Sequence, residues 1–545
     1  MTIDGLLADS RPLRGGLDTP PWLSRRDSAG DILHILLLFA TFAVLDRVTR
    51  ALASIDDTFL EGPTLVGGAI RSNPWMWAAG AAALAAIGTR WPRRFFGNWS
   101  TLEKGRVLRS LAVALLAFLT WVGVLYEFNF LLGELHLIDR MLLFGLAVAS
   151  FCRPIFLTLF VIQSRVITTQ FIEPFGSTSA RNMDDLLVFA LLAIAAAHIL
   201  FVFIDRRETA PVLLVVSAAI ATHYFVPGRT KLTTDWITIN ELSNLPLSSY
   251  TAGFLGHGDG AWARSASNVI RSIGWPALAG TLLVEMGSLV AVIHPKLMRL
   301  WLIGPILFHT ALFALTGFWF LGWLILEIGV LIILFKPELR EWVAQNATPA
   351  RAGIALFVVV AGGSFLFHPH PLTWYDSPVS YGYRMEARGE SGVVYQVPIS
   401  AFAPFVQDLS FMRAKLGLTE PASGGYGYVV SQDEYRALQA VDSFEDVRAL
   451  EGVVDASRLG PARDFMLRFM EHTNTGPQGA WEALSPPDYF WTSSPDPKFD
   501  FQEPIETLDV LLVTSIHNNG DPLYETSPIM SVELDDRGHP VVTNP

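Results

Sequence analysis

The amino-acid sequence predicts a polytopic α-helical membrane protein that carries a water-soluble domain at its C-terminus. The first reason is composition, since 51% of the residues are hydrophobic, only 17% are charged and the mean hydropathy is +0.38. Water-soluble chains of this length are rarely so apolar. The second reason is distribution, because runs long enough to cross about 30 Å of hydrocarbon end near Phe367.

Hydrophobic runs between charged or proline-rich breaks predict about eleven membrane helices. We expect them near residues 32–48, 74–90, 107–126, 134–151, 154–172, 184–204, 209–226, 272–293, 298–316, 317–336 and 352–368. The residues before Asp31 include several arginines but no apolar stretch of the kind found in signal peptides. We therefore expect the first run to be an uncleaved anchor.

The distribution of Lys and Arg predicts the orientation. With the N-terminus in the cytoplasm, that side has about 18 basic residues against about 7 in the opposite loops, an asymmetry that the positive-inside rule expects. This places residues 371–545 outside the cytoplasm, in the periplasm or the cell exterior if the membrane is a bacterial inner membrane. The only cysteine, Cys152, excludes an intrachain disulfide.

Residues 371–545 have the composition of a soluble domain of α+β or β-sandwich-like type. Alternating apolar stretches predict strands near 392–397 and 510–514, and helical periodicity favours helices near 403–415, 432–440 and 460–471. Much of the net charge of −12 lies here, which argues against nucleic acid as a partner. We expect this domain to cap the outer mouth of the helix bundle.

The loop expected at 227–271 contains the most distinctive lysine of the chain. A lysine at a membrane boundary is commonly a snorkelling anchor, whose ammonium reaches the headgroups. Pro227 and Gly228 are expected to break the helix just before Lys231, however, and Asp235 and Trp236 follow one turn later. These neighbours favour a lysine that is held at an irregular junction.

Three segments carry a pattern that extends beyond composition. The first, Tyr224–Trp236, reads YFVPGRTKLTTDW; the second starts at Phe308-His309 and runs into a Gly- and Phe-rich helix; the third, Leu372–Tyr383, follows the last span. In order and spacing they resemble the vitamin K-dependent gamma-glutamyl carboxylase superfamily, including its bacterial relatives with a horizontally transferred transmembrane domain. The resemblance covers residues 107–390.

The resemblance implies particular site residues. Lys231 takes the place of the initiating base of the family, and His309 that of its functional histidine. Positions that contact substrate or quinone correspond to Tyr224, Gly228, Asp235, Trp236, Glu285, Asn182, Tyr381 and Tyr383. One departure lies beside Asn182, where the family has a histidine and this chain has Met183.

The activity that the resemblance implies is that of a lyase-type carboxylase. A deprotonated lysine takes a proton from a reduced quinone of the vitamin K hydroquinone or menaquinol kind, and O2 adds to form a strong base. That base removes a proton from a glutamyl γ-carbon or another carbon acid, which captures CO2. The substrate would be a peptide, a lipid or a small molecule, because the soluble domain is much shorter than that of the animal carboxylases, which recognise a protein through its propeptide.

The residues meet some of the demands of this chemistry. A lysine acts as a base near neutral pH only when burial or a neighbouring cation disfavours its charged form, and Arg229 is the nearest candidate cation. The aromatic residues between Trp301 and Phe320 are able to line an apolar quinone pocket. His368 and His370 have no third ligand nearby, so no metal site is predicted.

The resemblance also divides the chain. Residues 1–30 would be a cytoplasmic segment, 31–106 an additional helix pair with its loop, 107–370 a nine-helix carboxylase-like core, and 371–545 the extracytoplasmic domain. The loss of the histidine at Met183 keeps an alternative open. In that alternative the protein is a non-catalytic descendant that binds a quinone or lipid, for example as a subunit of a complex.

Overall fold

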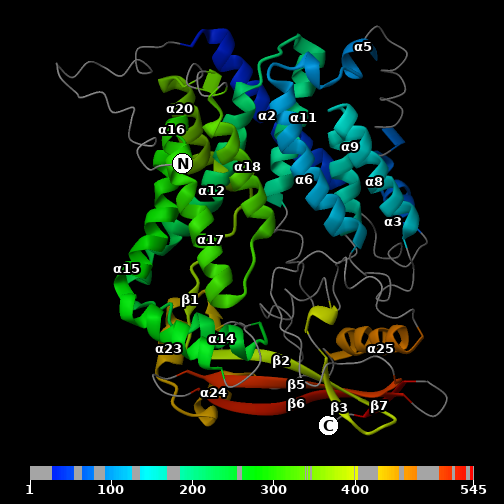
Figure 1. Cartoon of the computed structure of the whole chain (residues 1–545), viewed down its shortest axis with the longest axis vertical. Helices are drawn as coiled ribbons and strands as arrows, with labels where there is room; N and C mark the ends of the chain where they lie inside the picture. The colour runs from blue at the N-terminus through cyan, green and yellow to red at the C-terminus, as the bar shows by residue number, and fades with distance from the viewer. Residues whose placement is uncertain are drawn as a thin grey trace.

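The computed structural model shows a helical bundle with a β-sheet at one end (Figure 1). It describes residues 27–54, 64–75, 77–78, 92–125, 136–168, 185–254, 260–337, 339, 342–343, 347–397, 399–402, 427–452, 459–475, 503–517, 522–534 and 540–543. Within these ranges, seven helices are long and apolar enough to cross a membrane. The prediction of a polytopic helical membrane protein is therefore confirmed.

The bundle consists of long apolar helices joined by shorter ones. The long helices are α2 (Ala29–Leu52), α6 (Gly105–Leu125), α8 (Leu137–Cys152), α9 (Phe156–Thr168), α11 (Asp185–Ile204), α12 (Ala210–Thr233), α15 (Ala261–Ala291), α17 (Ile303–Thr316) and α18 (Leu321–Phe335). The shorter ones are α3 (Leu65–Ser72), α5 (Pro92–Phe95), η2 (Trp99–Thr101), α13 (Trp236–Ile239), α14 (Leu245–Thr251) and α16 (Pro295–Trp301). The last span combines α20 (Pro349–Phe357), a π-helical turn η4 (Val358–Gly362) and α21 (Gly363–Leu366).

Helices α11 and α12 form the centre of the bundle. In each of them 83% of the most apolar stretch is buried, whereas the other spanning helices are buried over 22–39%. Helix α11 is apolar on all sides, as expected for a helix surrounded by others. The outer helices expose large apolar side chains such as Leu283 and Phe357, which suits contact with lipid.

One of the expected helices is longer than the sequence predicts, and another is mostly not described. The helix expected at 272–293 begins at Ala261 and is kinked at Gly274, whose φ of 32° lies in the left-handed region, two residues before Pro276. A glycine adopts this conformation without strain, so α15 continues across the kink. The helix expected at 74–90 lies mostly outside the described residues.

The predicted helix break before Lys231 is wrong. Helix α12 continues through Pro227 and Gly228, so that Lys231 lies in its last turn. A proline removes one backbone hydrogen bond from a helix, but membrane helices tolerate it where neighbouring helices pack on both sides. Gly228 instead allows α12 and α15 to pack closely, because a Cβ there would lie 2.8 Å from the Cβ of Glu285 on α15.

The C-terminal part has α+β structure. Its antiparallel five-stranded sheet has the order β3 (Val394–Val397), β2 (Val379–Gly389), β5 (Ile505–Ile516), β6 (Leu523–Leu534), β7 (Pro540–Thr543), and β1 (Tyr375–Asp376) pairs with β4 (Tyr428–Val429). The helical elements are η5 (Ile399–Phe402), α23 (Gln432–Gln439), α24 (Phe444–Leu450) and α25 (Gly460–Thr475). The described strands thus do not form the sandwich that was the alternative, and the helix expected near 403–415 lies outside the described residues.

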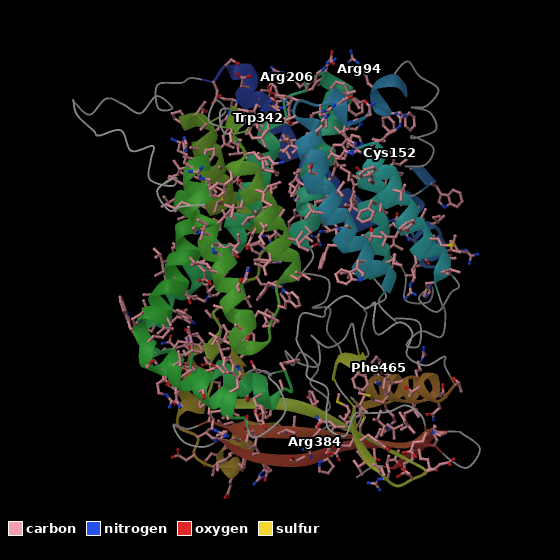
Figure 2. All side chains as sticks on the ribbon, viewed as in Figure 1. Arg94, Cys152, Arg206, Trp342, Arg384 and Phe465 are labelled. Carbon is pink, nitrogen blue, oxygen red and sulfur yellow. The ribbon has the colours of Figure 1, made fainter. Side chains whose placement is uncertain are left out.

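The sheet packs against the end of the bundle where α12 ends and α15 begins (Figure 1). Helix α14 lies directly on β2, and Gly382 is the point of closest approach, because a Cβ there would overlap the Thr251 backbone carbonyl. Figure 2 shows the labelled Arg94 and Arg206 at the opposite end of the bundle, far from Arg384 in the sheet. Lys231 therefore lies at the end of the bundle that faces the C-terminal part.

Candidate functional site

Five polar side chains from four helices meet inside the bundle, and we call them the lysine cluster. They are Tyr224 and Lys231 on α12, Glu285 on α15, His309 on α17 and Glu327 on α18. Tyr224 and Lys231 are two helical turns apart and thus lie on the same face of α12. All five are at most 6% exposed. Such burial is costly for ionisable groups and marks candidate functional residues in a membrane protein.

Lys231 and Glu285 form the half of the cluster nearer the C-terminal part. The Lys231 Nζ donates a hydrogen bond to Glu285 Oε1, and both side chains are 8% exposed. The ammonium also lies 5.1 Å from the centroid of the Trp236 ring, a cation–π distance. The predicted influence of Arg229 is not seen: its guanidinium lies over the Phe225 ring and the residue is exposed, so the charge beside Lys231 is a carboxylate.

Tyr224, His309 and Glu327 form the other half. The Tyr224 hydroxyl donates to Glu327 Oε1 at 2.5 Å and lies 3.3 Å from His309 Nε2. His309 Nδ1 is 3.4 Å from Glu327 Oε2. A buried carboxylate thus holds a phenol and an imidazole in fixed positions, which is the kind of arrangement that orients groups for proton transfer.

Aromatic rings enclose this half of the cluster. The centroid of the Trp301 ring lies 5.1 Å from that of Tyr224, and Phe320 stacks on His309 at 4.5 Å. Trp323 contacts both Tyr224 and His309, at 5.9 Å and 5.6 Å. The expected aromatic pocket therefore includes Trp301 and Phe320, together with Trp323.

Each glutamate of the lysine cluster has one oxygen that accepts no hydrogen bond. These atoms are Glu285 Oε2 and Glu327 Oε2, and both are buried. Buried carboxylate oxygens are normally hydrogen-bonded. The cluster thus has acceptors available for a hydroxyl, an amine or a water inside an otherwise apolar enclosure.

Other predicted site residues lie elsewhere. Asp235 is exposed and accepts a hydrogen bond from Gln432 Nε2 at 2.9 Å, so it joins α12 to α23. Tyr381 and Tyr383 lie on β2, where the Tyr381 hydroxyl donates to Glu451. Asn182 lies outside the described residues.

Trp236 links the lysine cluster to the C-terminal part. Its indole Nε1 donates to the Trp374 carbonyl at 2.8 Å, and the same carbonyl accepts from Asn240. Asn240 also accepts from the Asp376 backbone N–H at 2.7 Å. Burial raises the pKa of Asp376 well above its usual range, although its Oδ2 accepts from the Asn244 N–H. The segment after the last span is thereby fixed to α13.

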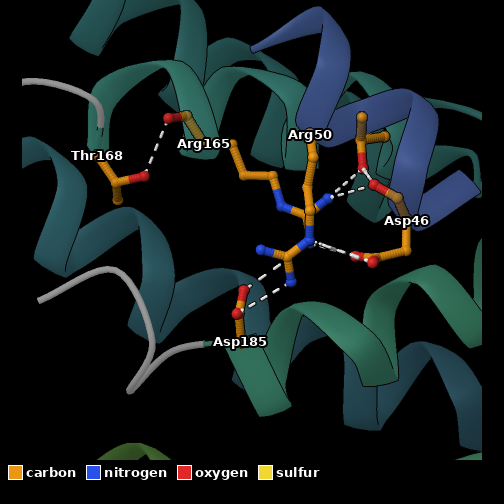
Figure 3. Close-up of polar contacts among 6 residues, drawn as sticks. Asp46, Arg50, Arg165, Thr168 and Asp185 are labelled. Carbon is orange, nitrogen blue, oxygen red and sulfur yellow. Dashed lines mark hydrogen bonds and ion pairs between the residues drawn. The ribbon is translucent and has the colours of Figure 1, made fainter. Parts of the chain in front are cut away.

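A second polar group, which we call the charge quartet, is partly buried and joins three helices of the N-terminal half (Figure 3). It consists of Asp46 and Arg50 on α2, Arg165 on α9 and Asp185 on α11. Arg165 lies 2.5 Å from Asp46 Oδ1 and 3.8 Å from Asp185 Oδ1, and Arg50 lies 3.1 Å from Asp46 Oδ2 and 3.0 Å from Asp185 Oδ2. Every carboxylate oxygen of the quartet thus faces an arginine, and the charges balance.

The sequence prediction missed Glu327 and the charge quartet, yet a signal for both was present. Glu327 lies in the run expected at 317–336, and Asp46 and Arg165 lie in the runs expected at 32–48 and 154–172. An ionisable residue within a spanning run is a candidate functional residue with a partner on another helix. Treating Glu327 in the same way as Glu285 would have found it.

Comparison with known proteins gives no relative for this chain: no protein-family model, curated protein or solved structure matches it. Functional inference therefore rests on the site itself. Among the described residues, no three His, Cys, Asp or Glu side chains gather closely enough to hold a metal ion. The chemistry available to the lysine cluster is that of proton transfer and hydrogen bonding.

Proposed function

We propose that the protein is a membrane-embedded carboxylase-like enzyme that uses a reduced quinone and O2 to activate a carbon acid for CO2 addition. The observation that carries the proposal is the lysine cluster. An amine, two carboxylates, an imidazole and a phenol converge from four helices inside the bundle. Three of these residues, Tyr224, Lys231 and His309, belong to the segments that resemble the carboxylase superfamily, and Glu285 corresponds to an acidic position of that family.

The residues present suit a reduced quinone. The rings of Trp301, Phe320 and Trp323 provide apolar surface, and Glu285 Oε2, which accepts no hydrogen bond, is able to accept one from a ring hydroxyl. When bound, a reduced quinone with O2 would supply the strong base that removes a proton from a carbon acid.

The roles of the protein groups follow from their contacts. Lys231 Nζ exchanges a proton with Glu285 Oε1, and the exchange converts the ion pair into a neutral amine and a neutral acid, which are the less costly forms away from water. The neutral amine is the base. His309 stabilises developing negative charge in the dry enclosure, and Glu327 fixes the positions of His309 and Tyr224.

The orientation completes the proposal. The positive-inside distribution puts the N-terminus in the cytoplasm and the C-terminal sheet outside. The lysine cluster then lies toward the outer end of the bundle, under α13 and the sheet. A peptide, lipid or small-molecule substrate would reach it from that side.

The test is oxygen uptake by the purified protein in detergent, with a hydroquinone and bicarbonate supplied. Lys231→Ala is expected to lower hydroquinone-dependent uptake by about 100-fold or more, the contribution of a positioned base. Lys336→Ala is the matched control, because Lys336 is an exposed lysine at the end of α18. Uptake that is absent in the unsubstituted protein, while the hydroquinone still binds, would favour the non-catalytic quinone-binding protein instead.

A further inference from the structure

An apolar groove runs between α6 and α8, on the side of the bundle away from the lysine cluster. Its volume is about 450 Å³, within the range of ligand sites. Its walls come from one face of each helix: Val113, Leu116, Ala117, Thr120, Trp121 and Val124 on α6, and Phe144, Ala147, Val148 and Phe151 on α8. None of these lining side chains is charged.

The length of the groove suits a hydrocarbon chain. Its lining on α6 extends from Val113 to Val124, which corresponds to roughly 17 Å at 1.5 Å per residue. The antiparallel helix α8 lines it from Phe151 to Phe144. The groove therefore runs along the helix axes, the direction in which acyl chains lie in a bilayer.

One end of the groove has a positive charge. The Arg109 guanidinium lies 3.9 Å from the centroid of the Phe151 ring, which is itself part of the groove wall. The Nε of Arg109 is buried and donates no hydrogen bond. Arg106 is exposed within one turn before it on α6, and Lys104 is exposed directly before the helix begins. Figure 2 labels Cys152, the neighbour of Phe151, in the half of the bundle away from the sheet.

We propose that this groove binds an anionic phospholipid, with an acyl chain along α6 and α8 and the phosphate on Arg109. Both helices belong to the membrane part, so the occupant comes from the bilayer. The cation at the mouth selects a lipid with a net negative headgroup over a zwitterionic one. The planar guanidinium fork of Arg109 matches the oxygens of a phosphate. This end carries the excess of Lys and Arg that predicts the cytoplasmic side, where anionic lipids are enriched.

Native mass spectrometry of the full chain tests the proposal, with phosphatidylglycerol and phosphatidylcholine of identical acyl chains added in equal amounts. We expect phosphatidylglycerol to be retained preferentially. Arg109→Gln should weaken this retention about fivefold, the effect of one basic residue near an anionic lipid. Arg299→Gln is the matched control, because Arg299 lies over Phe335 at 4.8 Å near the same end of the bundle but lines no part of this groove.

A second variant tests the acyl chain separately from the headgroup. Ala147→Phe places a ring in the groove and should reduce retention of the lipid while leaving Arg109 in place. If this variant does not fold, Arg109→Gln alone still decides the proposal. Equal retention of the two lipids by the unsubstituted protein would overturn it, as would an Arg109→Gln protein that retains phosphatidylglycerol as well as the Arg299→Gln control does.

Discussion

The charge quartet and the lysine cluster are both buried among membrane helices, but they differ in how completely their carboxylates are paired. In the quartet, each of the four carboxylate oxygens lies within 3.8 Å of an arginine nitrogen. In the lysine cluster, Glu285 Oε2 accepts no hydrogen bond, and Glu327 Oε2 faces the His309 ring at 3.4 Å and not an arginine. A closed set of charges has no position for a ligand, whereas the open set does. We therefore interpret the charge quartet as a structural connection between helices and the lysine cluster as a candidate reaction site.

The largest expected effect is on the stability of the quartet. Asp46→Ala leaves the Asp185 carboxylate at 3.8 Å as the remaining charged partner of Arg165, although hydrogen bonds to the residue 46 carbonyl and to Thr49 stay in place. The change should lower the free energy of unfolding by about 3–5 kcal/mol, the usual cost of breaking a buried ion pair. The measurement is equilibrium unfolding in detergent. The double variant Asp46→Leu with Arg165→Met keeps the Arg50–Asp185 pair balanced, so it should cost less than the two single changes added together. Strict additivity would show that the quartet is not one unit.

The lysine cluster should respond in the opposite way. Glu327→Gln keeps an oxygen that accepts from Tyr224, so we expect the free energy of unfolding to change by no more than about 1 kcal/mol. Hydroquinone-dependent oxygen uptake should fall by about 100-fold, because the neutral amide no longer pairs with His309, which the proposal assigns to stabilising developing charge. Asp185→Asn in the quartet is the control, with the reverse pattern expected. A Glu327→Gln protein that is fully active but unstable would remove the distinction between the clusters.

A carboxylate outside the membrane provides a reference for both groups. Burial and nearby Glu525 raise the pKa of Glu451 from 4.5 to about 7, and its oxygen accepts from the Tyr381 hydroxyl instead of a cation. Since the folded state holds this proton more tightly than the unfolded state, the contribution of Glu451 to stability should be largest below pH 4.5 and decrease as the pH rises through 7. Glu451→Gln should remove this contribution in unfolding curves measured across that range. An unchanged pH profile would contradict the assignment.

Sequence reasoning found the membrane helices because hydrophobic length is a local property. It placed Lys231, Glu285 and His309 among the site residues, and the structure brings these three into one cluster with Tyr224. It failed where packing between segments that are distant in the sequence determines whether a helix continues. Pro227 and Gly228 are helix breakers in isolation, but the close approach of α15 explains the glycine and keeps α12 intact.

The sequence also did not predict which residue on another helix pairs with Lys231. Arg229 was expected beside Lys231 because it is near in the chain, yet residue 229 lies on another face of the helix from residue 231. The actual neighbour, Glu285, is 54 positions away. Sequence periodicity predicts which residues share a helix face. Which residues of other helices contact that face is known only from the arrangement of the helices in the structure.

Trp236 touches both parts of the molecule at once, with its ring beside the Lys231 ammonium and its N–H on the Trp374 carbonyl. Removal of everything after Phe367 would therefore leave the indole without its acceptor and Asn240 without both of its hydrogen-bond partners on residues 374 and 376. The helical bundle and the sheet are not separable modules that can be exchanged between proteins. Any chimera that joins this bundle to a foreign C-terminal part needs a strand that presents a carbonyl to Trp236.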